Sequence, residues 1–381
     1  MIRFTRLLCL TACVLLAACS SNDEKKALKP AELVDFDATI ALKKVWGAKA
    51  GSGQDVRYTR FVPAVDETTA YAADVDGGVF AFDKKTGKRK WRVKTDYLTS
   101  GAINVFDGVL AIGTYDARVV ALSAQTGETL WSTEVSSEIL APPANNGQVV
   151  VVQTIDSRVF ALDSKTGELR WSYDHTTPVL TLRGTSTPVM ASSQVFVAFD
   201  NGQIISLSNS DGAQTWEARV SQPKGRTELE RIVDIDGTPL VDGGMIYAAT
   251  YHGTLAAFAR TQGRMIWQQD LSSHQNLSIS RGRIFASTEE DSVAAFDAAS
   301  GAILWKNDQL FLRNIGAPTV IGDYVAVIDE NGYMHVLSQQ TGEFVYRFKP
   351  SGDGFRSPMV SDDNRLLVLS DDGVLSSYEI K

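Results

Sequence analysis

The chain has 381 residues, 44% of them hydrophobic and 22% charged, so it is long enough and apolar enough to bury a large core. Its formal net charge is −8 at pH 7. Nucleic acid and an anionic lipid surface both require clustered Lys and Arg. We expect no basic block in so acidic a chain, which excludes both as direct partners.

Residues 1–18 predict a cleaved secretory signal peptide. Arg3 and Arg6 precede an apolar run, and Leu16-Ala17-Ala18 closes this run with small residues. That order of basic, apolar and small residues is typical of secretory signals, and the run is too short to span a bilayer. An N-terminal membrane anchor that is retained is the alternative.

The segment from Leu16 to Cys19 resembles the bacterial lipobox, and this resemblance implies that Cys19 is acylated and begins the mature chain. Stable anchoring needs more than one acyl chain, so we expect multiple acylation. Ser20 stands where an aspartate would favour the inner membrane, so the expected location is the outer membrane, lipid-anchored and facing the periplasm. Cys9 and Cys13 lie in the signal, which leaves no disulfide in the mature chain.

Residues 19–40 are assigned to the lipidated N-terminus and a tether, and residues 41–381 to one repetitive domain. In each repeat an apolar residue precedes a glycine by five positions, and an aromatic residue follows that glycine by four. Successive aromatic residues are separated by a length typical of a four-stranded propeller blade. The glycines are Gly87, Gly127, Gly167, Gly212, Gly263, Gly301 and Gly342, and the aromatic residues are Trp91, Trp131, Trp171, Trp216, Trp267, Trp305 and Tyr346.

Each repeat predicts four short antiparallel strands. In the second repeat a strand begins at Ala102, and Asp107-Gly108, Asp116-Ala117-Arg118 and Thr126-Gly127 are turns. The repeated glycine is explained by a turn that needs a positive φ. The repeated tryptophan is explained by packing between neighbouring blades, which accounts for its recurrence better than ligand stacking does.

The two ends of the domain complement each other. The segment from Asp371 to Tyr378 has a third strand without a fourth, whereas Leu42 to Trp46 has the pattern of a fourth strand alone. We predict that the two segments form one blade, with Trp46 as its aromatic anchor, which closes the ring and removes its open edges. The predicted fold is all-β: an eight-bladed β-propeller of four-stranded antiparallel blades.

The pattern Ala81-Phe82-Asp83, Thr86-Gly87 and Trp91 resembles the repeat of quinoprotein dehydrogenases and covers nearly all of the mature chain. The same repeat occurs in the BamB family of non-catalytic lipoproteins, which are subunits of the outer-membrane β-barrel assembly machinery. The lipobox, the length and the eight repeats are similar to BamB proteins, as are residues 180–186 and 231–236.

A quinone-dependent dehydrogenase is the main alternative. Those enzymes resemble one another in long insertions, a calcium site of clustered carboxylates and amides, an Asp base and often an adjacent cysteine pair. Here no Cys-Cys follows the signal, and the repeats leave little room for a domain that covers a cofactor. The four histidines lack metal-ligand spacing, and Asp234 to Gly237 is only a fragment of a calcium loop. We therefore predict no catalytic residue, no metal and no cofactor.

The connections between blades differ in length. Apart from the connection that follows the ring-closing strand, the two longest connections run from Trp171 to Pro188 and from Trp216 to Pro239. These two connections are consecutive in the chain. Long loops on a rigid scaffold commonly carry binding residues. Since consecutive connections emerge side by side, we expect a partner-binding site there.

Leu180, Leu182 and Arg183 in the first connection combine apolar anchors with a planar cation, a mixture that suits a protein interface. Asp234 and Asp236 in the second would pair with a basic partner or hold Arg183 in place. The alternative is that Leu180 and Leu182 begin the inner strand of the next blade.

By resemblance, BamB proteins use the matching positions to bind the periplasmic POTRA domains of BamA. This resemblance implies BamA POTRA domains and other subunits of the machinery as partners, with nascent outer-membrane proteins as a further candidate and membrane contact through the lipid anchor only. A periplasmic propeller that binds another protein or a glycan is the third alternative.

Overall fold

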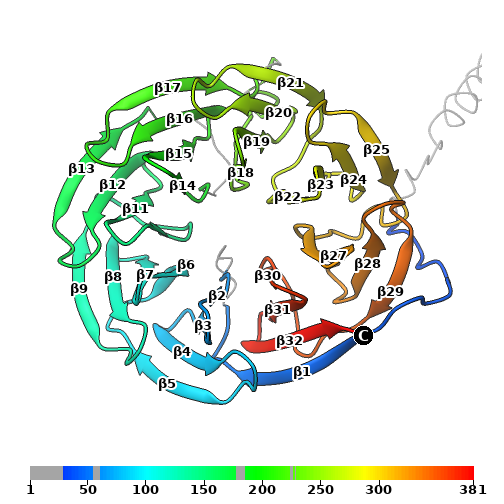
Figure 1. Cartoon of the computed structure of the whole chain (residues 1–381), viewed down its shortest axis with the longest axis horizontal. Coiled ribbons are helices and arrows are strands. Elements are labelled where there is room, and N and C mark those ends of the chain that lie inside the picture. The colour runs from blue at the N-terminus through cyan, green and yellow to red at the C-terminus, as the bar shows by residue number, and fades with distance from the viewer. Residues whose placement is uncertain (1–28, 55–60, 177–184, 224–225, 228) are drawn as a thin grey trace, which may run out of the picture. The chain divides into compact units, whose positions relative to one another are not determined.

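Eight four-stranded antiparallel sheets are arranged around a common axis in the computed structural model (Figure 1). The structure describes residues 29–54, 61–176, 185–223, 226–227 and 229–381, and residues 31–381 form one compact unit. The predicted eight-bladed propeller is therefore confirmed. No helix in this described part is long and apolar enough to cross a membrane.

Blades 1 to 8 follow chain order, and within each blade the strands run from the axis outward. Blades 1 and 2 consist of β2 (Ala64–Val65), β3 (Thr69–Ala73), β4 (Gly78–Asp83), β5 (Arg89–Lys94), β6 (Thr99–Phe106), β7 (Val109–Thr114), β8 (Arg118–Ser123) and β9 (Thr129–Glu134). Blades 3 and 4 consist of β10 (Ala144–Asn145), β11 (Val149–Gln153), β12 (Arg158–Asp163), β13 (Leu169–Asp174), β14 (Val189–Ala191), β15 (Gln194–Ala198), β16 (Gln203–Ser208) and β17 (Gln214–Arg219).

The second half of the ring repeats the same order. Blades 5 and 6 consist of β18 (Leu240–Asp242), β19 (Met245–Ala249), β20 (Thr254–Ala259), β21 (Met265–Asp270), β22 (Ser278–Ser280), β23 (Arg283–Ser287), β24 (Val293–Asp297) and β25 (Ile303–Asn307). Blades 7 and 8 consist of β26 (Thr319–Ile321), β27 (Tyr324–Ile328), β28 (Met334–Ser338), β29 (Phe344–Phe348), β30 (Val360–Asp362), β31 (Arg365–Leu369), β32 (Val374–Ile380) and β1 (Leu42–Lys49).

Blade 8 is built from both ends of the domain. Strand β1 pairs antiparallel with β32, in a register that runs from Leu42 opposite Ile380 to Lys49 opposite Val374. Figure 1 shows β1 lying along the outside of β32. The predicted ring closure is confirmed, and backbone hydrogen bonds replace what would otherwise be two open edges.

The core lies between blades. The second and third strands of each blade are almost wholly buried, for example in β3 and β11, where β-branched and small side chains fill both faces. One core cluster joins Tyr71 of blade 1 to Leu110 and Ile112 of blade 2. Because every cluster of this kind joins neighbours, the stability of each blade depends on the two blades beside it.

Each tryptophan on an outer strand packs on the repeated glycine of the next blade. At Gly167 a Cβ would stand 2.6 Å from the Trp131 ring, and φ is +74°. Glycine is therefore required at this position for two reasons: the backbone φ is positive, and the indole leaves no room for a side chain. The indole N–H also donates to a carbonyl of the next blade: Trp46 to Lys84, Trp91 to Ala124, Trp131 to Ser164, Trp171 to Asn209, Trp216 to Arg260, Trp267 to Ala298 and Trp305 to Gln339, at 2.9–3.1 Å.

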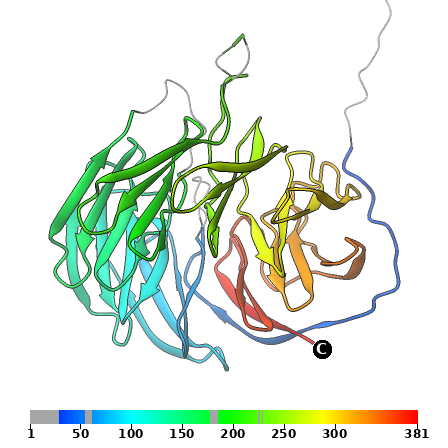
Figure 2. The ribbon, with the colours of Figure 1, turned by 45° about the horizontal axis from the view of Figure 1, so that its top comes forward.

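The two faces of the ring differ in the turns they carry. The Thr-Gly turns between third and fourth strands lie on one face, together with the turns between first and second strands. The turns between second and third strands share the other face with the crossings to the next blade. In blade 1, for example, Thr95 begins the crossing after β5, and its amide donates to the carbonyl of Gly77 in the β3–β4 turn (2.8 Å). We call this second face the crossing face, and Figure 2 shows the crossings rising from it.

The residues just before β1 lie against blade 7. The Ala31 amide donates to the Phe311 carbonyl (2.9 Å), and the Thr39 amide donates to the Val345 carbonyl (3.0 Å). The Phe36 ring stacks on that of Phe344, with centroids 5.7 Å apart. Residues 31–40, part of the predicted tether, therefore contact the propeller along the outer edge of blade 7.

Deleting residues 1–46 should lower the melting temperature of the whole domain, because blade 8 would lose most of its outer strand and Gly87 would lose the Trp46 ring. Differential scanning calorimetry of the truncated and full-length proteins measures this. An unchanged melting temperature would show that the N-terminal strand does not close the ring.

Substitution of Gly167 by Ala should destabilise the domain more than substitution of Gly108, whose φ is +76° but whose Cβ would meet nothing within 4 Å. Both variants place Ala in a left-handed conformation, at a cost of about 1–2 kcal/mol. Only Gly167→Ala also displaces Trp131, and such overpacking adds roughly 1–3 kcal/mol. Urea unfolding would give both values, and equal losses would rule out the indole contact as the second requirement.

Candidate partner-binding site on the crossing face

Apart from the segment after β1, the two longest crossings are residues 175–188 and 220–239, which leave blades 3 and 4 on the same face. Of the sequence-predicted site residues, Leu180, Leu182 and Arg183 lie outside the described residues. Asp234 and Asp236 are described. The inner strand of blade 4, β14, begins at Val189, beyond both leucines.

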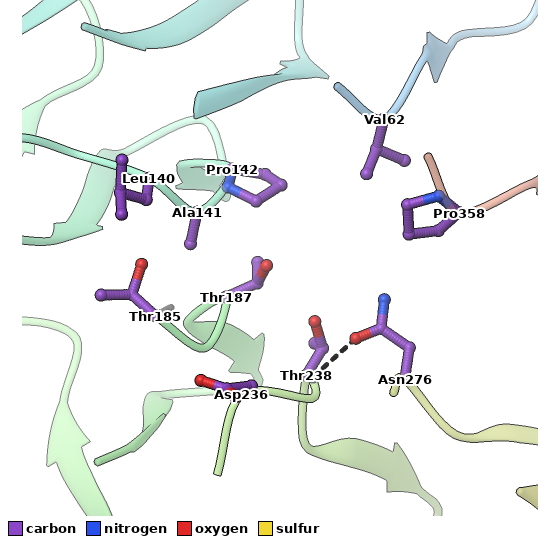
Figure 3. Close-up of a pocket in the computed structure, with 10 residues that line it drawn as sticks. All are labelled: Val62, Leu140, Ala141, Pro142, Thr185, Thr187, Asp236, Thr238, Asn276 and Pro358. Atoms are coloured by element: carbon purple, nitrogen blue, oxygen red, sulfur yellow. Dashed lines mark hydrogen bonds between the residues drawn. The ribbon is translucent and has the colours of Figure 1, made fainter. Parts of the chain in front are cut away.

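These two crossings touch each other, and the second touches the one that follows it. The Ser186 hydroxyl, which is buried, donates to the Gly237 carbonyl (3.2 Å). Gly237 has no room for a side chain, because a Cβ would lie 2.6 Å from the carbonyl oxygen of Gln275. Next to it, the Thr238 amide donates to Asn276 Oδ1 (2.8 Å) (Figure 3). Three consecutive crossings are thus held together at their inner ends.

Asp234 does not reach the surface. Its side chain is 0% exposed, and its neighbours Val233 and Ile235 are also buried. Its backbone carbonyl accepts a hydrogen bond from the Tyr251 amide (3.0 Å) of blade 5. Asp236, two residues later, is half-buried. The structure therefore places Asp234 behind the surface, where it can orient its neighbours, and Asp236 at the surface itself.

A third carboxylate, Asp200, joins these two. It comes from the turn between β15 and β16 and is 7% exposed. One oxygen from each of Asp200, Asp234 and Asp236 lies within 4.8 Å of the others. Burial, followed by the charges of Asp234 and Asp236, raises the pKa of Asp200 to about 8. Asp200 is therefore mostly protonated at neutral pH, which lowers the charge that the cluster holds.

A cavity of about 260 Å³ opens beside Asp236. Its lining comes from crossing segments around the ring, and Figure 3 shows these side chains facing a common space. The lining residues are Val62, Leu140, Ala141, Pro142, Thr185, Thr187, Asp236, Thr238, Asn276 and Pro358. Asp236 is the single charged side chain among them, so the wall is largely apolar with hydroxyl and amide groups.

Comparison with known proteins decides the family. The family model for outer membrane protein assembly factor BamB matches residues 75–307 and 289–381. The chain belongs to the BamB family. A Pseudomonas aeruginosa BamB is 38% identical over the full length of both chains, and the Escherichia coli BamB is 33% identical over 97% of each.

The solved structures agree with this assignment. The crystal structure of BamB from Moraxella catarrhalis matches with a TM-score of 0.82 and 30% identity, covering 89% of this chain and all of the other. A quinohemoprotein alcohol dehydrogenase from Comamonas testosteroni matches with a TM-score of 0.69 and 14% identity, covering 89% of this chain and 76% of the enzyme. The dehydrogenase shares the fold alone.

The chain is not an enzyme of the dehydrogenase type, because its full-length relatives are BamB assembly factors. The crossing-face cavity also fits a quinone with calcium poorly. Cofactor sites are commonly about 300–1,000 Å³, and Ca²⁺ takes about 6–8 oxygen ligands. The lining offers one carboxylate, one side-chain amide and three threonine hydroxyls, and the carboxylates of Asp200 and Asp234 beside Asp236 are buried.

Sequence reasoning missed Asp200. It lies far from Asp234 in the chain, and only the ring geometry brings the β15–β16 turn beside the next crossing. The three apolar neighbours of Asp234, which are Ile232, Val233 and Ile235, were a signal that this part of the crossing is buried, and an Asp in such a segment needs a partner.

The raised pKa of Asp200 predicts that the stability of the folded chain depends on pH. Between about pH 4 and pH 8 the folded chain keeps a proton that the unfolded chain has released, so the free energy of unfolding falls as pH rises through this window. One such proton gives a slope of up to about 1.4 kcal/mol per pH unit. Asp200→Asn should flatten this slope.

Urea unfolding at a series of pH values measures the slope, with Asp308→Asn as the control at an exposed position of another crossing. The control should keep the wild-type slope. If Asp200→Asn and wild type lose stability in parallel up to pH 8, the carboxyl group of Asp200 is not protonated in the folded chain.

Proposed function

We propose that this chain is a non-catalytic scaffold lipoprotein of the outer-membrane β-barrel assembly complex. Membership of the BamB family over nearly the whole chain carries this proposal. The lipid site is Cys19, after removal of residues 1–18. Acylation there would hold the propeller at the outer membrane, on the periplasmic side.

The proposed partner is BamA, bound through its POTRA domains at the crossing face. Leu180, Leu182 and Arg183 would supply the apolar anchors and the cation of the interface. Two observations support this location: the hydrogen bond from Ser186 to Gly237 links the two long crossings, and a half-buried carboxylate, that of Asp236, lines the cavity at the same place. Asp234 and Asp200 would act from behind as positioning residues, with Arg183 the proposed counter-ion.

A rigid propeller suits a subunit of an assembly complex whose other periplasmic domains are flexible. Every blade is clamped by two neighbours, so the crossing face keeps its shape when a partner binds. A propeller held at the membrane can then fix the orientation of flexible periplasmic domains, and nascent outer-membrane proteins are further candidate ligands of the assembled complex.

Replacing Leu182 and Arg183 together, by Ala or by Glu, should abolish co-purification of BamA from detergent-solubilised envelopes. The physical reason is that an interface loses most of its binding free energy when its anchors are removed. The melting temperature should change by no more than a few degrees, because these residues lie in a crossing and precede β14.

Leu169→Ala with Arg170→Ala is the matched control, because this adjacent Leu–Arg pair is exposed on the outer strand β13. In its ion pair with Asp163 the Arg170 side chain is 58% exposed and that of Asp163 is 14% exposed, and ion pairs near the surface typically contribute little to stability. The control should retain BamA. Loss of folding in the Leu182 and Arg183 variant would instead support the alternative in which Leu180 and Leu182 belong to blade 4, and retention of BamA would exclude this site.

A further inference from the structure

A dense run of cations lies on the outer strand of blade 1. The sequence from Lys84 to Lys94 carries Lys or Arg at positions 84, 85, 88, 89, 90, 92 and 94, in a chain whose formal net charge is −8. Our expectation that so acidic a chain has no basic block is therefore wrong at this strand. Averaging charge over the whole chain concealed it.

Strand β5 presents these cations at alternate positions. Trp91 and Val93 point towards blade 2, where both would contact a Cβ at Gly127. Lys90, Arg92 and Lys94 are exposed and alternate with them, so they lie on the opposite side of the strand. The result is a row of positive charges with the period of a β-strand.

The blade holds two of these side chains in place, and Lys90 also interacts electrostatically with the carboxylates of Asp66 and Asp83. Lys90 Nζ donates to Thr69 Oγ1 (2.6 Å), and the Arg92 guanidinium lies 5.3 Å from the centroid of the Phe80 ring. Within the described part of the chain, neither Arg92 nor Lys94 forms an ion pair. Cations that are ordered by neutral groups remain available to an external anion.

The outer side of β5 also has backbone groups to offer. The strand is last in its sheet, in the order β2-β3-β4-β5, so no described strand pairs with its outer edge. Edge strands of this kind accept an added strand, whose main chain forms the hydrogen bonds while its side chains set specificity.

Protection against aggregation does not account for the row. Lysines on an edge strand discourage edge-to-edge pairing. If this ring required such protection, its other outer strands would carry it too. Strand β21 instead exposes Met265 and Ile266 and carries no Lys or Arg, and β25 exposes Ile303 and Leu304 with one lysine. The charge is densest on β5, with four cations in six residues, and β1 of the neighbouring blade 8 follows with three lysines in eight.

We propose that the outer edge of β5 binds an extended polypeptide segment with acidic residues at alternate positions, as a fifth strand of blade 1. In an added strand, every second side chain would lie beside Lys90, Arg92 or Lys94, and opposite charges on neighbouring strands attract. The side chains between them would lie beside Trp91 and Val93, and are expected to be uncharged.

The alternation favours a strand over an anionic membrane. A lipid surface attracts any cluster of cations and does not select a spacing of two. In addition, the segment that leads into β1 carries Glu32, Asp35 and Asp37, which an anionic surface would repel. A strand with acidic residues at alternate positions matches both the positive charge of β5 and the two-residue spacing of its cations.

The test uses the full chain and a fluorescently labelled synthetic peptide of about ten residues, a usual strand length, in which glutamate alternates with threonine. Fluorescence anisotropy should show saturable binding. Arg92→Glu with Lys94→Glu should weaken it at least about tenfold, since two attractive cross-strand pairs become repulsive. Arg170→Glu, a charge reversal at an exposed site on the outer strand of blade 3, should leave binding unchanged.

Two further probes separate strand addition from simple charge attraction. A peptide of the same composition with a central proline cannot complete the ladder and should bind at least about tenfold more weakly. If it binds equally well, or if phosphatidylglycerol vesicles bind the wild type in a manner lost in Arg92→Glu with Lys94→Glu while the peptide does not bind, the proposal is overturned. An unchanged melting temperature shows that the variant folds.

This proposal is independent of BamA binding. The double variant on β5 should still co-purify BamA, because β5 belongs to blade 1 and the proposed BamA site belongs to the crossings that leave blades 3 and 4. Loss of the peptide with retention of BamA is the expected pair of results, and peptide binding unaffected by the β5 variant would refute the assignment.

Discussion

The contact between an outer-strand indole and the glycine of the next blade is the interaction on which the rest of the structure depends. It joins blades that are neighbours in space through residues that are a whole repeat apart in sequence, as Trp131 and Gly167 are. Each indole also donates a hydrogen bond to the next blade, so the contact has both a distance and a direction. Repeated around the ring, it fixes the angle between blades and thereby their number.

The same interaction explains the one exception among the aromatic residues. Tyr346 of blade 7 faces blade 8, whose third and fourth strands, β32 and β1, are not consecutive in the chain and have no Thr-Gly turn between them. An indole there would have no glycine to cover. Tyr346 instead packs beside Phe348, with ring centroids 5.4 Å apart, in the cluster that includes Tyr378 of β32.

The repeat makes the fold predictable from sequence, and it limits what else can be predicted. Periodic glycine and tryptophan determine blade number, strand order and ring closure, because these follow from contacts that recur at one spacing. The second role of the glycine was hidden, since its tryptophan lies in the preceding repeat. The Asp200 cluster occurs once, so no repeat points to it. The row of cations on β5 is visible in the sequence, but it is hidden when charge is averaged over the whole chain. Leu180, Leu182 and Arg183 lie outside the described residues, so their role stays a prediction.

The packing between blades leaves two kinds of surface free to vary: the crossings between blades and the exposed sides of the outer strands. Crossings can lengthen without disturbing the blades, and residues 175–188 and 220–239 do so where the Ser186–Gly237 hydrogen bond links their inner ends. Outer strands cannot lengthen, but their exposed side chains can change, as they do on β5. The segment before β1 joins the ring at blade 7, where Arg313 reaches both Asp329 and the Ala31 carbonyl and Arg347 donates to the Val34 carbonyl. The N-terminal segment is therefore bound to blade 7 before the chain continues into β1, the strand that closes the ring.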